Sequence, residues 1–204
     1  MLLDKVEISC KTGDVIGLYG KNGVGKSTLL KSVFGVLKTD CLTVHIDGKF
    51  ISRNKIVGSN RIAYLPQEPF LPKSLRVRDL IPMCLTRLED QEKVFYAPKV
   101  SSFDMEKVGN LSAGQFRYLE ILLIANLDHD FLLLDEPFSM LEPSMKVIVK
   151  DKILEWSATK GIILTDHYYE DVMEISNTGV LLDRGNLAKV DDIEDLKKLG
   201  YVRR

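Results

Sequence analysis

The sequence predicts an α/β protein in which a mainly parallel sheet is flanked by helices on both faces. Strand-like and helix-like segments alternate over most of the 204 residues, as they do where parallel strands are joined by helical crossovers. A glycine-rich loop, residues 20–25, separates the first strand-like segment from the first helix-like one. The turn signal Asp47-Gly48 predicts a small antiparallel hairpin near the N-terminus.

The first predicted elements are a strand, a helix and the hairpin. Residues 14–19 contain a short apolar run and predict a buried strand. Residues 27–37 predict a helix, because their apolar side chains recur at helical spacing: Leu29, Leu30, Val33, Phe34 and Leu37. Residues 44–46 and 49–51 flank the turn and predict the two hairpin strands. This order places the glycine-rich loop between a strand and a helix.

Four later apolar runs predict the remaining strands, at residues 61–65, 131–134, 161–165 and 179–183. The 43 residues between Gln67 and Leu111 contain no comparable run. A chain of 204 residues can bury one sizeable core, so we expect a single domain over residues 1–204.

Residues 68–110 are predicted to form an inserted helical lobe, and residues 1–67 and 111–204 the RecA-like core. Helical spacing within the lobe extends over these residues: Val77, Leu80, Ile81, Cys84 and Leu88. The polar stretch 89–105 predicts loop or irregular structure.

Composition narrows the class of protein. The 28 Lys and Arg residues nearly balance 29 Asp and Glu residues, so a nucleic-acid partner is not expected. No apolar run approaches the roughly 18–20 residues of a membrane span, and no signal-like segment precedes the first strand, so we expect a cytoplasmic protein. The widely spaced Cys10, Cys41 and Cys84 are expected to be reduced, packed thiols without a chemical role.

Residues 20–27 match the phosphate-binding P-loop pattern at every fixed position. Glycines in this loop let successive N–H groups point at phosphate oxygens, and the following helix directs its positive end at the same anion. Lys26 is expected to neutralise the terminal phosphates, and Ser27 to offer its hydroxyl to Mg²⁺. The residues predicted to bind the nucleotide are Gly20, Asn22, Gly23, Val24, Gly25, Lys26, Ser27 and Thr28.

The strand at 131–134 ends in two acids, Asp135 and Glu136. In an open parallel sheet, ligands bind at the carboxyl ends of the strands, which is also where the P-loop lies. Asp135 could then hold Mg²⁺ through water, and Glu136 could orient and deprotonate an attacking water molecule. The alternative is a solvated turn after a strand; the presence of the P-loop favours the functional interpretation.

Residues 111–115, Leu-Ser-Ala-Gly-Gln, open a further predicted helix. Ser112 and Gln115 have the spacing of a capping box, in which each side chain caps the helix start. The start of a helix is also an anion site, and the two interpretations are compatible. The chain would then carry two anion sites.

Together these segments resemble the nucleotide-binding subunit of the ATP-binding-cassette (ABC) family, over nearly the whole chain. The matching motifs are Walker A at Gly20–Thr28, the Q-loop at Gln67, the signature at Leu111–Gln115, Walker B at Leu132–Glu136, the D-loop at Ser139–Glu142 and the switch histidine at His167. The signature discriminates the family, because many P-loop ATPases lack it. Ala113 stands where a second glycine is usual, and Glu142 where the D-loop usually has Asp. Members of the family usually carry an aromatic residue that stacks on adenine some residues before the segment that matches Leu2 to Ser9, and the sequence shows no such aromatic.

The resemblance implies a Mg²⁺-dependent ATPase that works as a head-to-tail dimer, a homodimer here, with two ATP molecules between the subunits. It assigns Lys26 and, from the second subunit, Ser112 to the γ-phosphate. Gly114 and Gln115 of the second subunit are assigned to the same ATP molecule as Ser112. Ser27 and Gln67 are assigned to Mg²⁺, Glu136 to the attacking water, and His167 to the γ-phosphate.

The resemblance also implies partners. The leading interpretation is the ATPase subunit of a membrane transporter, held at the inner face of the cell membrane by separate transmembrane subunits that dock near Gln67 and the lobe. Residues 66–69, 135–138 and 165–167 are similar to the branch containing lipopolysaccharide-export and branched-chain amino-acid ATPases. The alternatives are an ABC ATPase that remodels a protein complex, as in iron–sulfur assembly, and a regulatory ATP-binding module.

Overall fold

A six-stranded sheet forms the centre of the computed structural model, which describes residues 7–39 and 42–202. Its strand order is β4-β5-β6-β1-β7-β8, and all neighbouring pairs are parallel except β7 and β8. The strands are β1 (Val15–Tyr19), β4 (Ile62–Leu65), β5 (Phe131–Asp135), β6 (Gly161–Thr165), β7 (Thr178–Asp183) and β8 (Asn186–Val190). The predicted fold class, a mainly parallel sheet, is confirmed.

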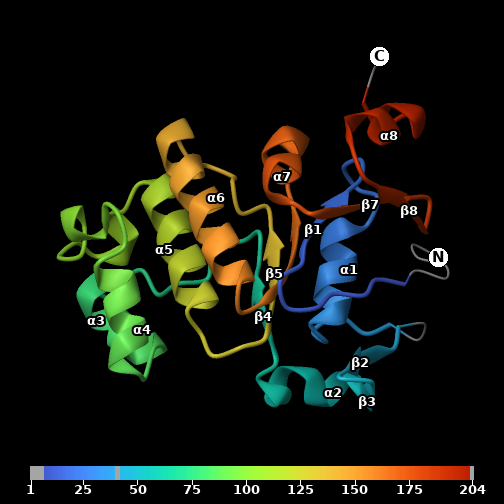
Figure 1. The fold of residues 1–204 in the computed structure, drawn as a ribbon. Helices are drawn as coiled ribbons and strands as arrows, with labels where there is room; N and C mark the ends of the chain where they lie inside the picture. Colours follow the sequence, from blue (N-terminus) through green and yellow to red (C-terminus); the bar gives the residue numbers. More distant parts are fainter. Residues whose placement is uncertain (1–6, 40–41, 203–204) are drawn as a thin grey trace.

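Helices cover both faces of this sheet (Figure 1). Helix α1 (Lys26–Val33) lies on one face, and α5 (Ala113–Ala125), α6 (Pro143–Ser157) and α7 (Tyr169–Ile175) lie on the other. The pleat of the strands makes this possible, because successive side chains point to opposite faces. Along β5, Leu133 packs in the cluster with α1, whereas its neighbours Leu132 and Leu134 pack in the cluster with α5 and α6.

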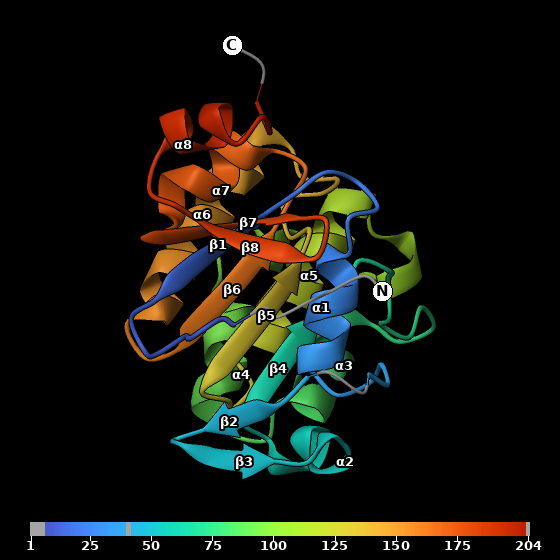
Figure 2. The same cartoon turned by 90° about the vertical axis from the view of Figure 1, so that its right-hand side faces the viewer.

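The predicted hairpin forms a separate two-stranded sheet of β2 (Val44–Ile46) and β3 (Lys49–Ile51). Its turn residues have positive φ, +52° at Asp47 and +72° at Gly48, as a two-residue hairpin turn requires. The short helix α2 (Arg53–Ile56) follows and lies beside the hairpin at one end of the molecule (Figure 2). The hairpin prediction is confirmed with its boundaries unchanged.

The sequence reasoning did not predict strand β8 or helix α8 (Ile193–Lys198). The turn between β7 and β8 has the same conformation as the earlier hairpin turn, with φ of +46° at Arg184 and +84° at Gly185. Arginine is an uncommon residue in this conformation, so the turn carried a weaker signal than Asp47-Gly48.

Two helices lie between β4 and α5: α3 (Val77–Cys84) and α4 (Leu88–Phe95). They lie at the end of the molecule remote from β8 (Figure 1). Short 3₁₀ turns at Val100–Ser102 and Val108–Asn110 complete the segment. The side chains of this segment join the same apolar cluster as those of α5. The boundaries of a separate lobe, residues 68–110, stay a prediction.

The expectation of loop or irregular structure over residues 89–105 is wrong at its start, where α4 forms. Helix α4 is polar and buries little, but its first turn is acidic, which suits the positive end of a helix. Its Asp90 is buried and pairs with Arg87 and Lys93 at 2.6 and 2.8 Å. The predicted helical spacing from Val77 to Leu88 is also interrupted. Leu85 has an extended backbone conformation, which ends α3.

The structure bears on two predictions made from composition, those on membrane spans and on the cysteines. Within residues 7–39 and 42–202, no helix combines the length and apolar character that a bilayer crossing needs. Burial, with the nearby charge of Asp14, raises the pKa of the Cys10 thiol to about 12, which disfavours a reactive thiolate. Cys84 is a free, partly buried thiol, and Cys41 lies outside the described residues.

Candidate functional site

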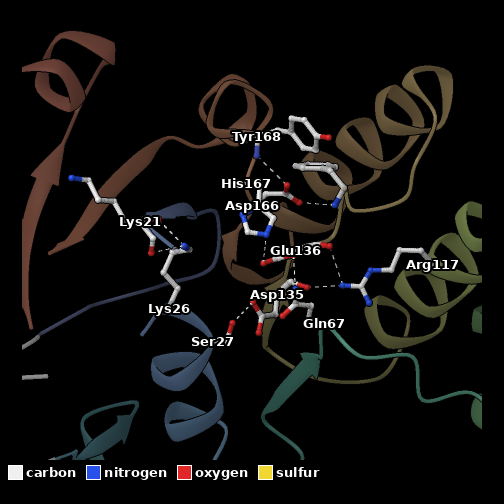
Figure 3. A network of polar contacts seen from close by, with 12 residues as sticks. Lys21, Lys26, Ser27, Gln67, Arg117, Asp135, Glu136, Asp166, His167 and Tyr168 are labelled. Atoms are coloured by element: carbon white, nitrogen blue, oxygen red, sulfur yellow. Dashed lines mark hydrogen bonds and ion pairs between the residues drawn. The ribbon is translucent and has the colours of Figure 1, made fainter. Parts of the chain in front are cut away.

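The carboxyl ends of four parallel strands bring the predicted site residues together at one edge of the sheet (Figure 3). The P-loop follows β1, Gln67 follows β4, Glu136 follows β5 and His167 follows β6. These segments are far apart in the sequence, and the parallel pairing of the strands places their ends side by side.

Glycine is required at two positions of the P-loop. A Cβ at Gly20, where φ is +154°, would lie 2.8 Å from the carbonyl oxygen of Leu182. Gly25 caps α1 with φ of +112°, a conformation that side chains disfavour, and provides no side chain to cap the first turn. The loop therefore brings backbone N–H groups and the positive end of α1 to one place, which suits an anion.

Lys26 turns its ammonium group back toward the loop. Its Nζ donates hydrogen bonds to the carbonyl oxygens of Gly20, at 2.6 Å, and Lys21, at 3.4 Å. Burial lowers the pKa of Lys26, and the nearby carboxylates of Glu136 and Asp135 oppose that effect. An anion in the loop would stabilise the charged ammonium, so the side chain is suited to bind phosphate.

Ser27 and Asp135 offer oxygen atoms of the kind that Mg²⁺ prefers. Ser27 Oγ donates to one carboxylate oxygen of Asp135 and Tyr64 donates to the other, both at 3.0 Å. Burial raises the pKa of Asp135, and these hydrogen bonds oppose the rise. A cation beside the fully buried carboxylate would stabilise its ionised form. Two protein oxygens suit an ion that shares its remaining positions with phosphates and water, so the residues fit Mg²⁺.

Glu136 is held by two side chains that the sequence motifs named. Gln67 Nε2 donates to Glu136 Oε2 at 2.8 Å, and His167 Nε2 lies 2.9 Å from Oε1. The backbone of Glu136 has φ of +54°, and its N–H donates to the carbonyl oxygen of Thr165 at 2.8 Å. A non-glycine residue in this conformation is strained by about 1–3 kcal/mol, which the surrounding contacts must offset. The contacts that hold this conformation fix where the carboxylate points.

Burial raises the pKa of Glu136. The neighbouring carboxylates of Asp166 and Asp135 add to the rise, and His167 and Lys26 oppose it. A carboxylate with a raised pKa is a better proton acceptor at neutral pH than an ordinary glutamate. The arrangement can therefore hold a water molecule and take its proton.

The signature residues lie away from this network. Ser112 Oγ accepts from the N–H of Gln115 at 3.2 Å, and Gln115 Oε1 accepts from the N–H of Ser112 at 2.9 Å, so the capping box is confirmed. A Cβ at Gly114 would lie 2.9 Å from the carbonyl oxygen of Met140, in the D-loop. The methyl group of Ala113 is exposed. Helix α5 covers the face of the sheet opposite to α1 (Figure 1), which separates these residues from the P-loop of the same chain.

The sequence reasoning missed three residues of the site. Tyr64 bonds Asp135, as described above. Buried Asp166 accepts from the N–H groups of Phe138, at 2.8 Å, and Tyr168, at 3.2 Å, which ties the turn after β5 to the turn that carries His167. Arg117 donates to the main chain beside Glu136. The signal available for Arg117 was a pair of charged residues, Arg117 and Glu120, within helix α5, whose other positions are mostly apolar. The expected lack of an adenine-stacking aromatic concerns the N-terminal end, where residues 1–6 lie outside the described residues.

Comparison with known proteins identifies a family and relatives of this chain. The sequence model of a family described as "ABC transporter" matches residues 3–139. An uncharacterized ABC transporter ATP-binding protein of Methanocaldococcus jannaschii is 26% identical over 98% of this chain and 76% of its own length. The lipopolysaccharide export system ATP-binding protein LptB of Escherichia coli is 28% identical over 100% of this chain and 89% of its own length. The branch resemblance is thereby confirmed on its lipopolysaccharide-export side.

Solved structures show the same fold. One described as the ATP binding subunit of an ABC transporter has a TM-score of 0.84 at 21% identity, covering 100% of this chain and 89% of the other. A nucleotide-free ATP-binding cassette from an ABC transporter has a TM-score of 0.82 at 24% identity, covering 99% and 90%.

Proposed function

The chain belongs to the ABC transporter family, as an ATP-hydrolysing, ATP-binding subunit, and from this premise we propose that two copies bind two ATP molecules between them. In each site the P-loop comes from one copy and the signature, Ser112 to Gln115, from the other. ATP binding then closes the dimer, and hydrolysis opens it, because the γ-phosphate is held from both sides only in the closed state. Closure moves separate transmembrane subunits.

The observation that carries this proposal is the placement of two helix starts on opposite faces of one sheet. Helix α1 begins at the P-loop and α5 begins at Ser112 (Figure 1). Both starts suit an anion. Because the sheet lies between α1 and α5, a phosphate in the P-loop is out of reach of Ser112 in the same copy. A second copy, turned head to tail, can supply the missing half.

In the proposed site each residue has a distinct role. Lys26 neutralises the terminal phosphates. Ser27 and Gln67 would hold Mg²⁺, and Asp135 would act on it through water; the ion would supply positive charge that stabilises the transferred phosphate. Glu136 orients the water and takes its proton. His167 contacts the γ-phosphate and, through its contact with Glu136, fixes the position of the base.

The transmembrane partner is proposed to dock on the segment between β4 and α5. Large apolar side chains are exposed along it, which marks a contact surface when they lie together: Phe70, Met83, Leu88, Tyr96 and Met105. Gln67 lies at the start of the same segment, so docking there connects the partner to the site. The partner would hold the chain at the inner face of the cell membrane.

Replacing Met83 and Leu88 by Asp is expected to abolish copurification of an integral-membrane partner from detergent-solubilised cells. These side chains are 69% and 74% exposed, so the changes should leave the fold intact. Leu154→Asp on α6, where Leu154 is 47% exposed, is the matched control and should retain the partner. Capture of soluble proteins alone by the unaltered chain would contradict the transporter proposal and favour remodelling of a protein complex.

Ser112→Asp separates the two roles of Ser112. Asp is as good a helix cap as Ser, so the thermal midpoint should match that of the unaltered chain. Its charge would face the γ-phosphate, so ATP hydrolysis should fall by about tenfold or more, since opposed like charges oppose closure. Ser112→Ala should instead lower stability by about 1 kcal/mol through loss of the cap. Full hydrolysis by Ser112→Asp would show that Ser112 is only a cap.

A further inference from the structure

Helix α5 carries a buried ion pair between Arg117 and Glu120. Arg117 is 5% exposed and Glu120 1% exposed, and Arg117 Nη1 lies 3.2 Å from Glu120 Oε2. The surrounding positions of α5 are apolar, so two charges here face a large desolvation penalty. Such a pair is retained only where further hydrogen bonds satisfy it. The other partners of the two side chains therefore indicate what the pair does.

Arg117 extends its guanidinium fork to two segments of the candidate site, and Figure 3 shows its contacts with the segment that contains Asp135 and Glu136. Nη1 donates to the carbonyl oxygen of Pro66 at 2.7 Å, in addition to Glu120. Nη2 donates to the carbonyl oxygens of Asp135, at 2.6 Å, and Glu136, at 3.1 Å. All four hydrogens on the terminal nitrogens are thereby used. Arg117 thus joins α5 to the residue before Gln67 and to the backbone of Glu136.

Glu120 holds the other end of the segment that contains Gln67. Its Oε1 accepts from the N–H of Phe70 at 2.8 Å. Burial raises the pKa of Glu120, and the hydrogen bond from Phe70 and the charge of Arg117 oppose the rise. Residues 66–70 are therefore tied to α5 at both ends, with Gln67 exposed between them. Gln67 in turn bonds the carboxylate of Glu136.

We propose that Arg117 and Glu120 are positioning residues for ATP hydrolysis: a clamp that fixes Gln67 and Glu136 to the helix that begins at Ser112. When Ser112 moves against the nucleotide bound by the other copy, helix α5 moves as one rigid body and shifts Gln67 and Glu136 with it. This inference rests on the proposed function, because it takes Glu136 as the base and Ser112 as a contact of the partner's nucleotide. Lysine cannot replace Arg117, because an ammonium group lacks the planar fork that reaches Pro66, Asp135 and Glu136 together.

The test compares Arg117→Lys and Arg117→Met with the double variant Arg117→Met, Glu120→Leu. Both single variants should lower kcat by about tenfold or more and change the Kd of ATP by less than about threefold, since the clamp does not touch the P-loop. Arg117→Met leaves Glu120 buried without its partner and should lower the thermal midpoint. The double variant removes the unpaired buried charge and should recover part of the lost midpoint while kcat stays low. Recovery is only partial because the carbonyl oxygens of Pro66, Asp135 and Glu136 still lack their donor.

Tyr118→Phe is the matched control on the same helix. Tyr118 is fully buried, and its hydroxyl has no hydrogen-bond partner among the described residues. This variant should keep both kcat and the thermal midpoint.

Recovery of kcat together with stability in the double variant would overturn the proposal, because the pair would then be structural only. Unchanged kcat in folded Arg117→Lys would overturn it as well.

Glu136→Gln, measured alongside, distinguishes failure of the clamp from failure of the proposed function. Hydrolysis by Glu136→Gln at the normal rate would remove the base that the clamp is meant to position, and both proposals would fall. Loss of hydrolysis in Glu136→Gln with normal kcat in Arg117→Lys would overturn the clamp alone. Loss in both variants, with ATP binding retained, is the result that we expect.

Discussion

Glu136→Gln should lower ATP hydrolysis by about a hundredfold or more while ATP still binds, because an amide cannot take the proton of the attacking water. Gln has nearly the same shape as Glu and can still contact Gln67 and His167, so the site should keep its geometry. With hydrolysis blocked, ATP should hold the dimer closed. The measurements are phosphate release and the sedimentation coefficient with and without ATP.

The unaltered chain should show a matching dependence on pH. Burial raises the pKa of Glu136, so the base becomes protonated, and the rate falls, at a higher pH than for an ordinary glutamate. Glu92→Gln, the same substitution at an exposed position of α4, is the control for Glu136→Gln and should keep the full rate of hydrolysis. Hydrolysis by Glu136→Gln at a rate close to that of Glu92→Gln would remove Glu136 from the mechanism.

Lys26→Ala should lose ATP affinity by about a hundredfold or more, because charge-assisted hydrogen bonds to phosphate are among the strongest that a side chain makes. The loss should be visible as a thermal midpoint that no longer rises when ATP and Mg²⁺ are added, since a ligand stabilises only what it binds. Without nucleotide, the variant should fold normally: the lowered pKa of Lys26, caused by burial, means that its charge does not stabilise the fold.

Lys21→Ala is the control for this change. Lys21 belongs to the same loop but is exposed, and its carbonyl oxygen, not its side chain, contacts Lys26. Its loss should weaken ATP binding far less. Equal effects of the two changes would indicate that the loop attracts phosphate by general positive charge, with no specific place for Lys26.

The residues that the sequence predicted best are those whose chemistry is local. The P-loop works through the conformation of six consecutive residues and the helix that follows, so its spacing alone identifies it. The capping box of Ser112 and Gln115 is local in the same sense and is confirmed at the predicted helix start. Strands such as β5 were recognised because burial on both faces makes them continuously apolar.

The elements that the sequence reasoning missed leave no mark in the spacing of apolar side chains. Helix α4 is polar, and its Asp90 is held by ion pairs that periodicity does not reveal. The clamp was invisible for a different reason. Arg117 donates to the backbone carbonyls of Pro66, Asp135 and Glu136, and a carbonyl is present at every residue, so no pattern of side chains marks the acceptors.

The most direct test is a crystal structure of Glu136→Gln with ATP and Mg²⁺. We expect each triphosphate to contact the P-loop of one copy and Ser112 and Gly114 of the other, with the ion beside Ser27. A triphosphate that contacts a single copy in every assembly in the crystal, with Ser112 and Gly114 turned toward solvent, would contradict a nucleotide shared between two chains.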